Sequence, residues 1–445
     1  MPILKLSRLM RPFEDFFKNQ ASGGIILLAT TILALVLANS PLSHFYHHFW
    51  EMKLTIGGET FGLTQSLHHW INDGLMAVFF FVVGLEIKRE FLAGELASKR
   101  KAALPIAAAL GGMIVPALIF ALINKDNGNL HGWGIPMATD IAFALGIIAL
   151  LGDRIPRSLA IFLTALAIVD DLGAVLVIAI FYTGDLSWVA LGLVGLCLFI
   201  LMVGNRLGIQ HPNFYALVGL VLWIALLKSG VHASIAGVLI GATIPVKPKH
   251  PHDEFVAKSE HLLRRYHESE TIPGPFHNEQ RLGTLLALEH VCHDSMSPLQ
   301  RMEHEMNPWV IYGVMPVFAL ANAGISLSGS ELATALTHPI TIGVGLGLLL
   351  GKPLGILLFS WLAVRMKFCD LPTGSRWYDV LGVGVLAGIG FTMSMFITNL
   401  AYADLARVAN AKVGIFAASI LAGVIGFILL SRRKQPPSLI VKKME

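Results

Sequence analysis

Charged residues are scarce in this sequence. Only 14% of its 445 residues are charged, whereas 55% are hydrophobic, and the mean hydropathy is +0.67. A soluble domain carries about a quarter charged residues to cover its surface, so a water-soluble fold is excluded. Cysteines are few as well: Cys197, Cys292 and Cys369 are scattered and odd in number, so no disulfide framework follows. The net charge of +4 is small and gives no reason to expect a nucleic-acid partner.

Long apolar runs recur along most of the chain. Runs of about 20 residues without strict alternation indicate helices rather than barrel strands. Backbone polar groups in lipid must also be paired internally. We expect an all-α polytopic membrane protein with twelve transmembrane helices, at residues 24–39, 67–87, 102–123, 133–151, 156–182, 187–204, 212–227, 231–246, 309–327, 339–364, 379–402 and 411–431.

The distribution of basic residues supports this topology. With the N-terminus inside, nearly all of the 33 Lys and Arg residues fall in inner segments. The outer segments carry only Lys53, Lys125, Lys228, Arg407 and Lys412. Because short cytoplasmic loops are rich in Lys and Arg, both termini are predicted to be cytoplasmic.

Three segments outside the spans have patterns of their own. Residues 2–20 resemble an amphipathic interfacial helix. We expect the run after it to remain as span 1 rather than be cleaved as a signal peptide, because Pro41 follows the candidate cleavage site. Residues 52–61 predict a short β-hairpin between spans 1 and 2, turning at Gly57-Gly58. Isolated hairpins are weak, so we expect it to pair with another surface, such as a second copy of the chain.

The chain is predicted to be a single domain over residues 1–445, in which 24–246 hold spans 1–8 and 309–431 hold spans 9–12. The loop between them, 247–308, is polar and rich in His. Helical periodicity in 253–268 and 278–292, with a Pro-Gly break between, predicts a helical hairpin on the cytoplasmic side. His290 and His293, with Cys292 beside them, could bind a metal. Solvated His-rich helices are commoner, so the sequence favours no resident metal there.

Ionisable residues inside spans are costly and usually line an ion or proton path, and four of them stand out here: Asp140, Asp170, Asp171 and Lys352. Asp170 and Asp171 are adjacent and point about 100° apart on a helix, so they can serve different partners. A purely structural pair would be the alternative, but two neighbouring mid-bilayer carboxylates argue against it. Lys352 needs a counter-charge, for which Asp170 is the obvious candidate; the alternative is that Lys352 extends to the membrane surface.

Asp140 follows Pro136, which disfavours a continuous helix. Thr139 and Asp140 then resemble the N-cap of a second half-helix. An interrupted helix leaves partial charges at membrane depth, and a carboxylate can compensate the positive N-terminal ends. An ordinary kinked helix capped by Asp140 is the alternative. A Gly-rich stretch at 388–395 predicts a second interruption, in span 11.

This chemistry suits the exchange of cations for protons. Burial disfavours the charged form of a carboxylate, so a buried one can exchange protons near neutral pH. Na⁺ is a hard ion that prefers oxygen ligands, as the alkaline-earth cations do. Ionised carboxylates, the Thr139 hydroxyl and freed backbone carbonyls could supply them. Competition of Na⁺ and H⁺ for the same oxygens, with alternating access, gives antiport without a cofactor.

Several motifs together resemble one family, the NhaA-type bacterial sodium/proton antiporters. The resemblance runs from about residue 10 to 432. The motifs are Phe-Phe-Phe-Val-Val-Gly-Leu-Glu-Ile-Lys-Arg-Glu at 79–90, Ala-Thr-Asp-Ile-Ala-Phe-Ala-Leu-Gly at 138–146, Ala-Ile-Val-Asp-Asp-Leu-Gly-Ala at 167–174, Lys-Ser-Gly-Val-His-Ala at 228–233 and Gly-Lys-Pro-Leu-Gly at 351–355.

The resemblance implies roles for the intramembrane residues. It makes Asp170 and Asp171 the central cation- and proton-binding carboxylates, and Asp140 and Thr139 site residues on the first interrupted helix. It makes Lys352 the partner of Asp170 that also balances half-helix ends. It further implies that spans 4 and 11 are crossing interrupted helices within inverted repeats of spans 3–5 and 10–12.

The resemblance also implies the physiology. We expect a non-enzymatic, electrogenic Na⁺(Li⁺)/H⁺ antiporter of the bacterial inner membrane. It would extrude sodium in exchange for external protons, for pH and sodium homeostasis, as a homodimer joined through the 52–61 hairpin.

A third implication concerns the response to pH. Residues that resemble the family's pH-response positions are Glu86, Arg89, His232, Glu303 and His304. Ordinary interfacial charges would be the alternative reading. The segment 253–295 resembles an insertion, and Asn307 stands where a histidine is expected, so the pH profile is the part of the resemblance that this sequence supports least.

Other functions remain to be compared with antiport. A sodium-coupled organic-anion symporter could use the same scaffold, but the Asp170-Asp171 pair with Lys352 favours cation/proton exchange. An intramembrane aspartyl protease needs Tyr-Asp and Gly-x-Gly-Asp contexts on facing helices, which the sequence lacks. Two interrupted helices and a titrating site favour a carrier over a channel.

Overall fold

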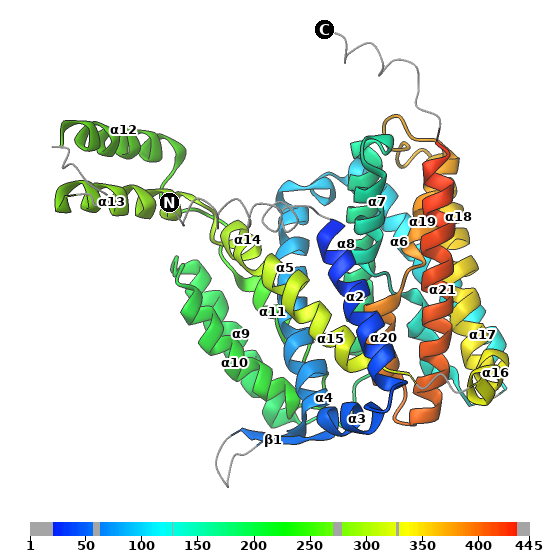
Figure 1. Ribbon diagram of the computed structural model, residues 1–445. Coiled ribbons are helices and arrows are strands. Elements are labelled where there is room, and N and C mark those ends of the chain that lie inside the picture. The colour runs from blue at the N-terminus through cyan, green and yellow to red at the C-terminus, as the bar shows by residue number, and fades with distance from the viewer. Residues whose placement is uncertain (1–20, 57–62, 127, 270–277, 326–328, 434–445) are drawn as a thin grey trace, which may run out of the picture.

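Helices make up most of the computed structural model, which describes residues 21–56, 63–126, 128–269, 278–325 and 329–433 (Figure 1). The only sheet in these ranges is two-stranded. The predicted all-α character and the short hairpin between spans 1 and 2 are confirmed. The predicted interfacial helix at 2–20 lies outside the described residues.

Seven helices of the described chain are long and apolar enough to cross a membrane, and two bent pairs pass the same test jointly. The seven are Leu67–Ala93, Lys99–Asn124, Leu130–Leu151, Arg157–Phe181, Trp188–Arg206, Pro339–Arg365 and Leu405–Ser431. The bent pairs are Ser22–Ala38 with Ser43–Glu51, bent by 110°, and Trp377–Ala387 with Phe391–Ala401, bent by 48°. A multi-pass membrane protein is therefore supported, while the number twelve stays a prediction.

The elements of the first half begin with α2 (Ala21–Ala38) and α3 (Ser43–Glu51), of which α3 was not predicted. The next span is composite, with α4 (Leu67–Trp70), a π-helical turn η1 (Ile71–Leu75) and α5 (Met76–Ala93). There follow α6 (Lys99–Asn124), the 3₁₀ helix η3 (Leu130–Met137), α7 (Ile141–Leu151), α8 (Arg157–Phe181), α9 (Trp188–Arg206), α10 (Pro212–Leu227) and α11 (Ile235–Thr243). Short 3₁₀ turns at Glu95–Ala97 and Gly152–Arg154 join α5 to α6 and α7 to α8.

The second half continues with α14 (Pro298–Trp309), a π-helical turn η5 (Val310–Val314) and α15 (Met315–Asn322). The remaining elements are α16 (Gly329–Thr337), α17 (Pro339–Leu346), η6 (Gly347–Gly351), α18 (Lys352–Arg365), α19 (Trp377–Ala387), α20 (Phe391–Ala401) and α21 (Leu405–Ser431). A helix therefore lies at each of the twelve predicted spans, although α10, α11 and α15 are too short to pass as spans alone.

The predicted turn at Gly57-Gly58 lies outside the described residues. Strand β1 (Lys53–Ile56) pairs antiparallel with β2 (Leu63–Ser66), and Ile56 faces Leu63. The register is set from outside the turn: Leu67 donates its backbone N–H to Met52 at 2.9 Å, and Ser66 caps α4. The second strand is therefore held next to the helix that follows it.

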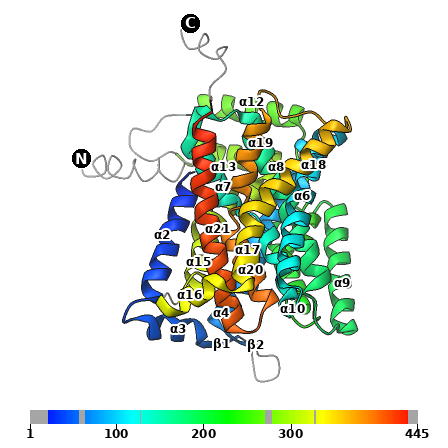
Figure 2. The ribbon, with the colours of Figure 1, turned by 90° about the vertical axis from the view of Figure 1, so that its right-hand side faces the viewer.

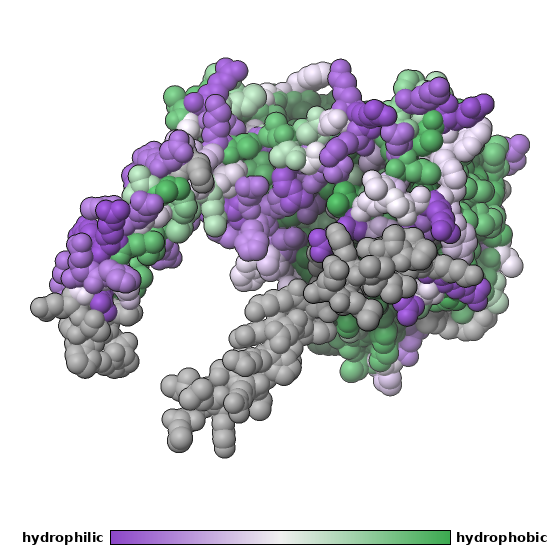
Figure 3. Space-filling model, turned by 90° about the horizontal axis from the view of Figure 1, so that it is seen from above, coloured by the Kyte–Doolittle hydropathy of each residue, from purple (hydrophilic) through white to green (hydrophobic). Residues whose placement is uncertain are grey.

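The predicted helical hairpin in the long loop is confirmed. It consists of α12 (His252–Glu268) and α13 (Glu279–Ser295). Figure 1 shows this arm projecting from the bundle at the end opposite to β1. Seen from that end, its surface is mainly hydrophilic (Figure 3). This hydrophilic surface suits a solvated arm, and its cytoplasmic location stays a prediction.

The helices that carry Lys352 pack at very short range. Figure 2 shows α18 beside α6. Gly111 of α6 and Gly355 of α18 face each other, and a Cβ on either would overlap the other's backbone carbonyl. Small residues allow this close approach of two membrane helices. The contact fixes the N-terminus of α18, and hence Lys352, against the core of the bundle.

Candidate functional site

Two interrupted helices meet in the core. The backbone between η3 and α7 is extended at Ala138 and Asp140, and Gly388–Gly390 separates α19 from α20. The backbone N–H of Asp140 donates to the carbonyl of Ile389 at 2.6 Å. The Thr139 hydroxyl donates to the carbonyl of Ala387, the last residue of α19, at 2.9 Å. The interruptions expected in spans 4 and 11 are therefore present and touch each other.

Asp140 is fully buried and serves the N-termini of two half-helices. Its Oδ1 accepts from the backbone N–H of Phe143 at 3.2 Å, which caps α7. Its Oδ2 accepts from the backbone N–H of Thr392 at 3.1 Å and from the Thr392 hydroxyl at 2.5 Å. Helix N-termini carry partial positive charge, so one carboxylate compensates α7 and α20 together. The sequence predicted this role but not the partner Thr392.

Lys352 compensates the opposite kind of helix end. Its Nζ donates to the carbonyl of Met137, the last residue of η3, and lies 2.5 Å from Oδ2 of Asp170. Both side chains of this ion pair are fully buried. Since carbonyls at a helix C-terminus carry partial negative charge, the ammonium is stabilised from two sides. The structure thus pairs Lys352 with Asp170, as expected from the sequence, and Lys352 does not extend to the surface.

Asp171 has a different environment from its neighbour. Both Asp170 and Asp171 of α8 are 1% exposed. Neither oxygen of Asp171, and only one oxygen of Asp170, has a hydrogen-bond partner among the described residues. A buried carboxylate without donors is costly unless it takes up a proton or a cation. Asp171 therefore offers two free ligand oxygens beside the crossing of the interrupted helices.

Three of the expected pH-response residues gather at the end of α5 near the arm. Arg89 forms an ion pair with Glu303 of α14, and Glu86 lies close enough to interact electrostatically with both. Burial raises the pKa of Glu303, and the Arg89 guanidinium opposes that rise. His304 is exposed beside them. This group contains two carboxylates and one guanidinium, so its net charge changes with pH.

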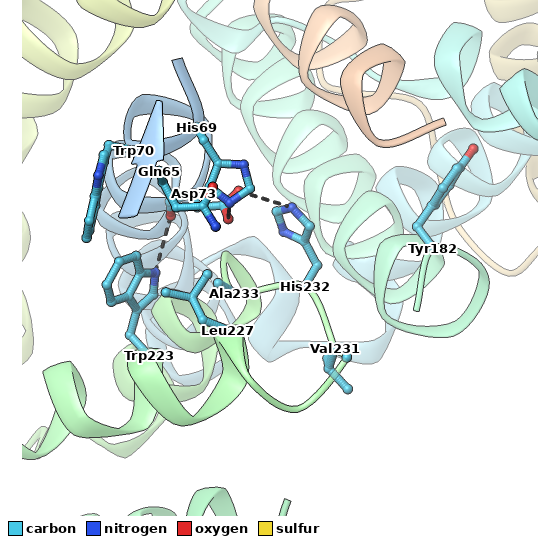
Figure 4. Close-up of a pocket in the computed structure, with 11 residues that line it drawn as sticks. Gln65, His69, Trp70, Asp73, Tyr182, Trp223, Leu227, Val231, His232 and Ala233 are labelled. Atoms are coloured by element: carbon cyan, nitrogen blue, oxygen red, sulfur yellow. Dashed lines mark hydrogen bonds and ion pairs between the residues drawn. The ribbon is translucent and has the colours of Figure 1, made fainter. Parts of the chain in front are cut away.

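His232 lies apart from this group. It faces a cavity of about 340 Å³ lined also by Gln65, His69, Trp70, Asp73 and Trp223 (Figure 4). Its Nε2 is 3.5 Å from Oδ1 of Asp73, whose Oδ2 is 3.0 Å from Nε2 of His69. Sixteen residues of helical rise separate Asp73 from Arg89, about 24 Å. The predicted pH-response residues therefore occupy opposite ends of α5.

Sequence reasoning missed Asp73 and Thr392. Asp73 lies within the predicted span 67–87, so the rule that flagged the other buried charges would have found it. Thr392 gave no comparable signal, because Thr is common in membrane helices and its partner Asp140 is 252 positions away.

Comparisons with known proteins agree with one another. The family model described as Na⁺/H⁺ antiporter 1 matches residues 14–430. The Na⁺/H⁺ antiporter NhaA 2 of Syntrophotalea carbinolica is 66% identical over 428 residues, which cover 96% of this chain and 98% of that protein. The NhaA antiporter of Acidithiobacillus ferrooxidans is 51% identical, covering 96% and 99%. The one from Escherichia coli O1:K1 / APEC is 46% identical, covering 96% and 100%. None of these three is named as a symporter of organic anions or as an enzyme.

Proposed function

Because the chain belongs to the Na⁺/H⁺ antiporter 1 family, we propose that its exchange of Na⁺ for H⁺ takes place at Asp171. The observation that carries this proposal is the pair of buried Asp171 oxygens without hydrogen-bond donors. Such a carboxylate is stable when it holds a proton or a cation and costly when it holds neither. Na⁺ and H⁺ therefore compete for it, and loading with one releases the other.

Asp170 shares the site through Lys352. When Na⁺ arrives at Asp171, the free Oδ1 of Asp170 is one residue away and can contribute a second ligand. The Lys352 ammonium then loses part of its electrostatic stabilisation by Asp170, so it releases a proton more readily. Two protons leave for one Na⁺ bound, so the exchange is electrogenic, and Li⁺, a hard ion of the same charge, uses the same oxygens.

Asp140 and Thr139 hold the crossing in shape. Each binds the end of a half-helix from the other interrupted helix. A small displacement of the crossing opens the site to one side and closes it to the other, which is alternating access. The two interruptions would occupy equivalent places in inverted repeats formed by spans 3–5 and 10–12.

Membership of this family also supports the topology, pH response and assembly expected for the chain. Twelve spans, with both termini cytoplasmic, form one domain in the bacterial inner membrane. Glu86, Arg89, Glu303 and His304 respond to cytoplasmic pH, and His232 to external pH. The hairpin around β1 joins two copies into a homodimer. The exchange serves pH and sodium homeostasis.

Everted membrane vesicles test the proposal. Na⁺ or Li⁺ added to respiring vesicles at alkaline pH should release protons from the lumen, reported by a fluorescent ΔpH probe. Asp171→Asn should abolish the release while the protein remains folded in the membrane. Asp126→Asn, which neutralises an exposed carboxylate in the loop after α6, is the matched control and should exchange normally. Full exchange by Asp171→Asn would remove Asp171 from the mechanism.

A further inference from the structure

The base of the α12–α13 arm gathers side chains that bind transition metals. His290, His293 and Asp294 of α13 each place one ligand atom within 4.8 Å of the other two. His250, just before α12, lies next to this group, with its Nε2 at 3.8 Å from Oδ2 of Asp294. Figure 1 shows α13 in the arm, which projects from the bundle that contains α8.

The spacing of these atoms suits a tetrahedral ion. Zinc binds His nitrogen and carboxylate oxygen at about 2.0–2.2 Å, which places neighbouring ligand atoms roughly 3.3–3.5 Å apart. Nε2 of His250 is 3.8 Å from Oδ2 of Asp294, close to this tetrahedral edge. Since His290, His293 and Asp294 each have a ligand atom within 4.8 Å of the other two, side-chain rotations can complete the geometry.

We propose that His290, His293 and Asp294, completed by His250, bind a divalent transition metal such as Zn²⁺. Imidazole ligands suit Zn²⁺, Ni²⁺ and Co²⁺, whereas Mg²⁺ and Ca²⁺ require oxygen ligands. The site is therefore distinct in chemistry from that for transported Na⁺. Cys292 does not belong to the group of side chains whose ligand atoms converge.

Three cations now contact the proposed ligands. Lys249 donates to Oδ2 of Asp294 at 2.8 Å, Lys258 lies 3.2 Å from Nε2 of His250, and Arg301 donates to Nδ1 of His293 at 3.0 Å. The Lys249 side chain is 59% exposed and can turn into water at little cost. Arg301 is buried, so His293 keeps that contact if it binds the metal through Nε2. The metal must compete with Lys249 and Lys258, and binding is expected to be weaker than at a structural zinc site.

Metal binding would couple parts of the protein that are distant in sequence. His250 follows α11, and Asp294 stands at the end of α13, directly before α14, which carries Glu303. An ion bound by both residues links the start of α12 to the end of α13. Since the ion binds the folded arrangement only, it also stabilises that arrangement.

Zinc binding to the purified, tag-free, full-length protein tests the proposal. Competition with a chromophoric chelator should show that His290→Ala/His293→Ala loses one equivalent of Zn²⁺ relative to the wild type. His261→Ala/His267→Ala, on the same arm outside the cluster, should lose none. Cys292→Ser should also retain the site.

Thermal melting provides a second readout that does not depend on transport. Added Zn²⁺ should raise the Tm of the wild type and of the control variant, but not that of His290→Ala/His293→Ala. Melting without metal shows whether each variant is folded. Equal Zn²⁺ stoichiometry in wild type and His290→Ala/His293→Ala, or equal loss in both double variants, would overturn the site, whatever the fate of the antiport proposal.

Discussion

Thr392 donates two hydrogen bonds to the same oxygen of Asp140, one from its backbone N–H at 3.1 Å and one from its hydroxyl at 2.5 Å. The other oxygen of Asp140 caps α7 through Phe143. A single carboxylate therefore joins the N-termini of half-helices from two interrupted spans. Because these N-termini lie in the core, without water to solvate them, the carboxylate is the natural compensation for their partial charges.

Removing the Thr392 hydroxyl should loosen this junction. Thr392→Val keeps the shape and the backbone N–H but leaves Asp140 with one donor fewer, so we expect a loss of about 1–3 kcal/mol in stability. Thr392→Ser retains the hydroxyl and should melt close to the wild type. Thermal unfolding in detergent compares the three proteins. Equal Tm values for Thr392→Val and wild type would show that the hydroxyl does not hold the junction.

Lys352→Ala should destabilise the protein more strongly. The variant leaves the Asp170 carboxylate and the Met137 carbonyl without their buried partner, and breaking a buried ion pair from one side costs about 3–5 kcal/mol. Asp170→Asn/Lys352→Met leaves no uncompensated charge and should recover part of the loss. Melting temperatures of the single and double variants measure this. A Lys352→Ala protein as stable as the wild type would contradict the importance of the pair.

The sequence identified the buried charged residues better than it identified their hydrogen-bond partners. Asp140, Asp170, Asp171 and Lys352 stand out because a charge in an apolar run has few explanations. The pairing of Lys352 with Asp170 followed from the need of a buried ammonium for a counter-charge. The contact between Asp140 and Thr392 did not follow, because local sequence carries no information about a partner on another helix.

Predictions of the fold likewise succeeded where local sequence determines the structure and failed where contacts with other segments determine it. The arm α12–α13 was predictable because helical periodicity interrupted by a Pro-Gly break indicates a solvated helical hairpin. The register of β1 against β2 could not be predicted from the Gly57-Gly58 signal, because it depends on contacts of Met52 and Ser66 with the start of α4. Helix α3 was missed because nine residues rich in His and aromatics resemble a loop more than a span.

A buried polar network offers a further test of the packing. Asn322 of α15 is fully buried, donates to Oδ1 of Asn72 at 2.9 Å, and accepts from Asn399 of α20 at 2.6 Å. His68, with its Nε2 at 3.0 Å from Oδ1 of Asn322, is a third side-chain partner. Asn322→Leu removes all three contacts and should cost about 2–4 kcal/mol. Asn213→Leu, at an exposed position of α10, is the control. Similar melting of the two variants would show that the network contributes little.

Glu303 should make stability depend on pH. Burial holds its pKa above the ordinary value of 4.5, although Arg89 opposes this rise and Glu90 reinforces it. A carboxyl with a raised folded-state pKa stabilises the fold fully below its unfolded pKa, and this contribution is lost as pH rises through the folded pKa.

Glu303→Gln removes this dependence. The Tm of the wild type minus that of Glu303→Gln should therefore fall as the pH rises from about 4 towards neutrality. Thermal melting across that range, in one detergent and at constant ionic strength, measures the difference. A difference that grows with pH would mean that the pair with Arg89, and not burial, dominates at Glu303.

Binding of Na⁺ to the purified protein tests most directly whether Asp171 is the point of exchange. Titration of Na⁺ into weakly buffered protein should release protons, with an affinity that falls as pH is lowered, because protons then hold the carboxylate. Asp171→Asn should neither bind Na⁺ nor release protons while melting as a folded protein. Undiminished Na⁺ binding and proton release by Asp171→Asn would contradict the account.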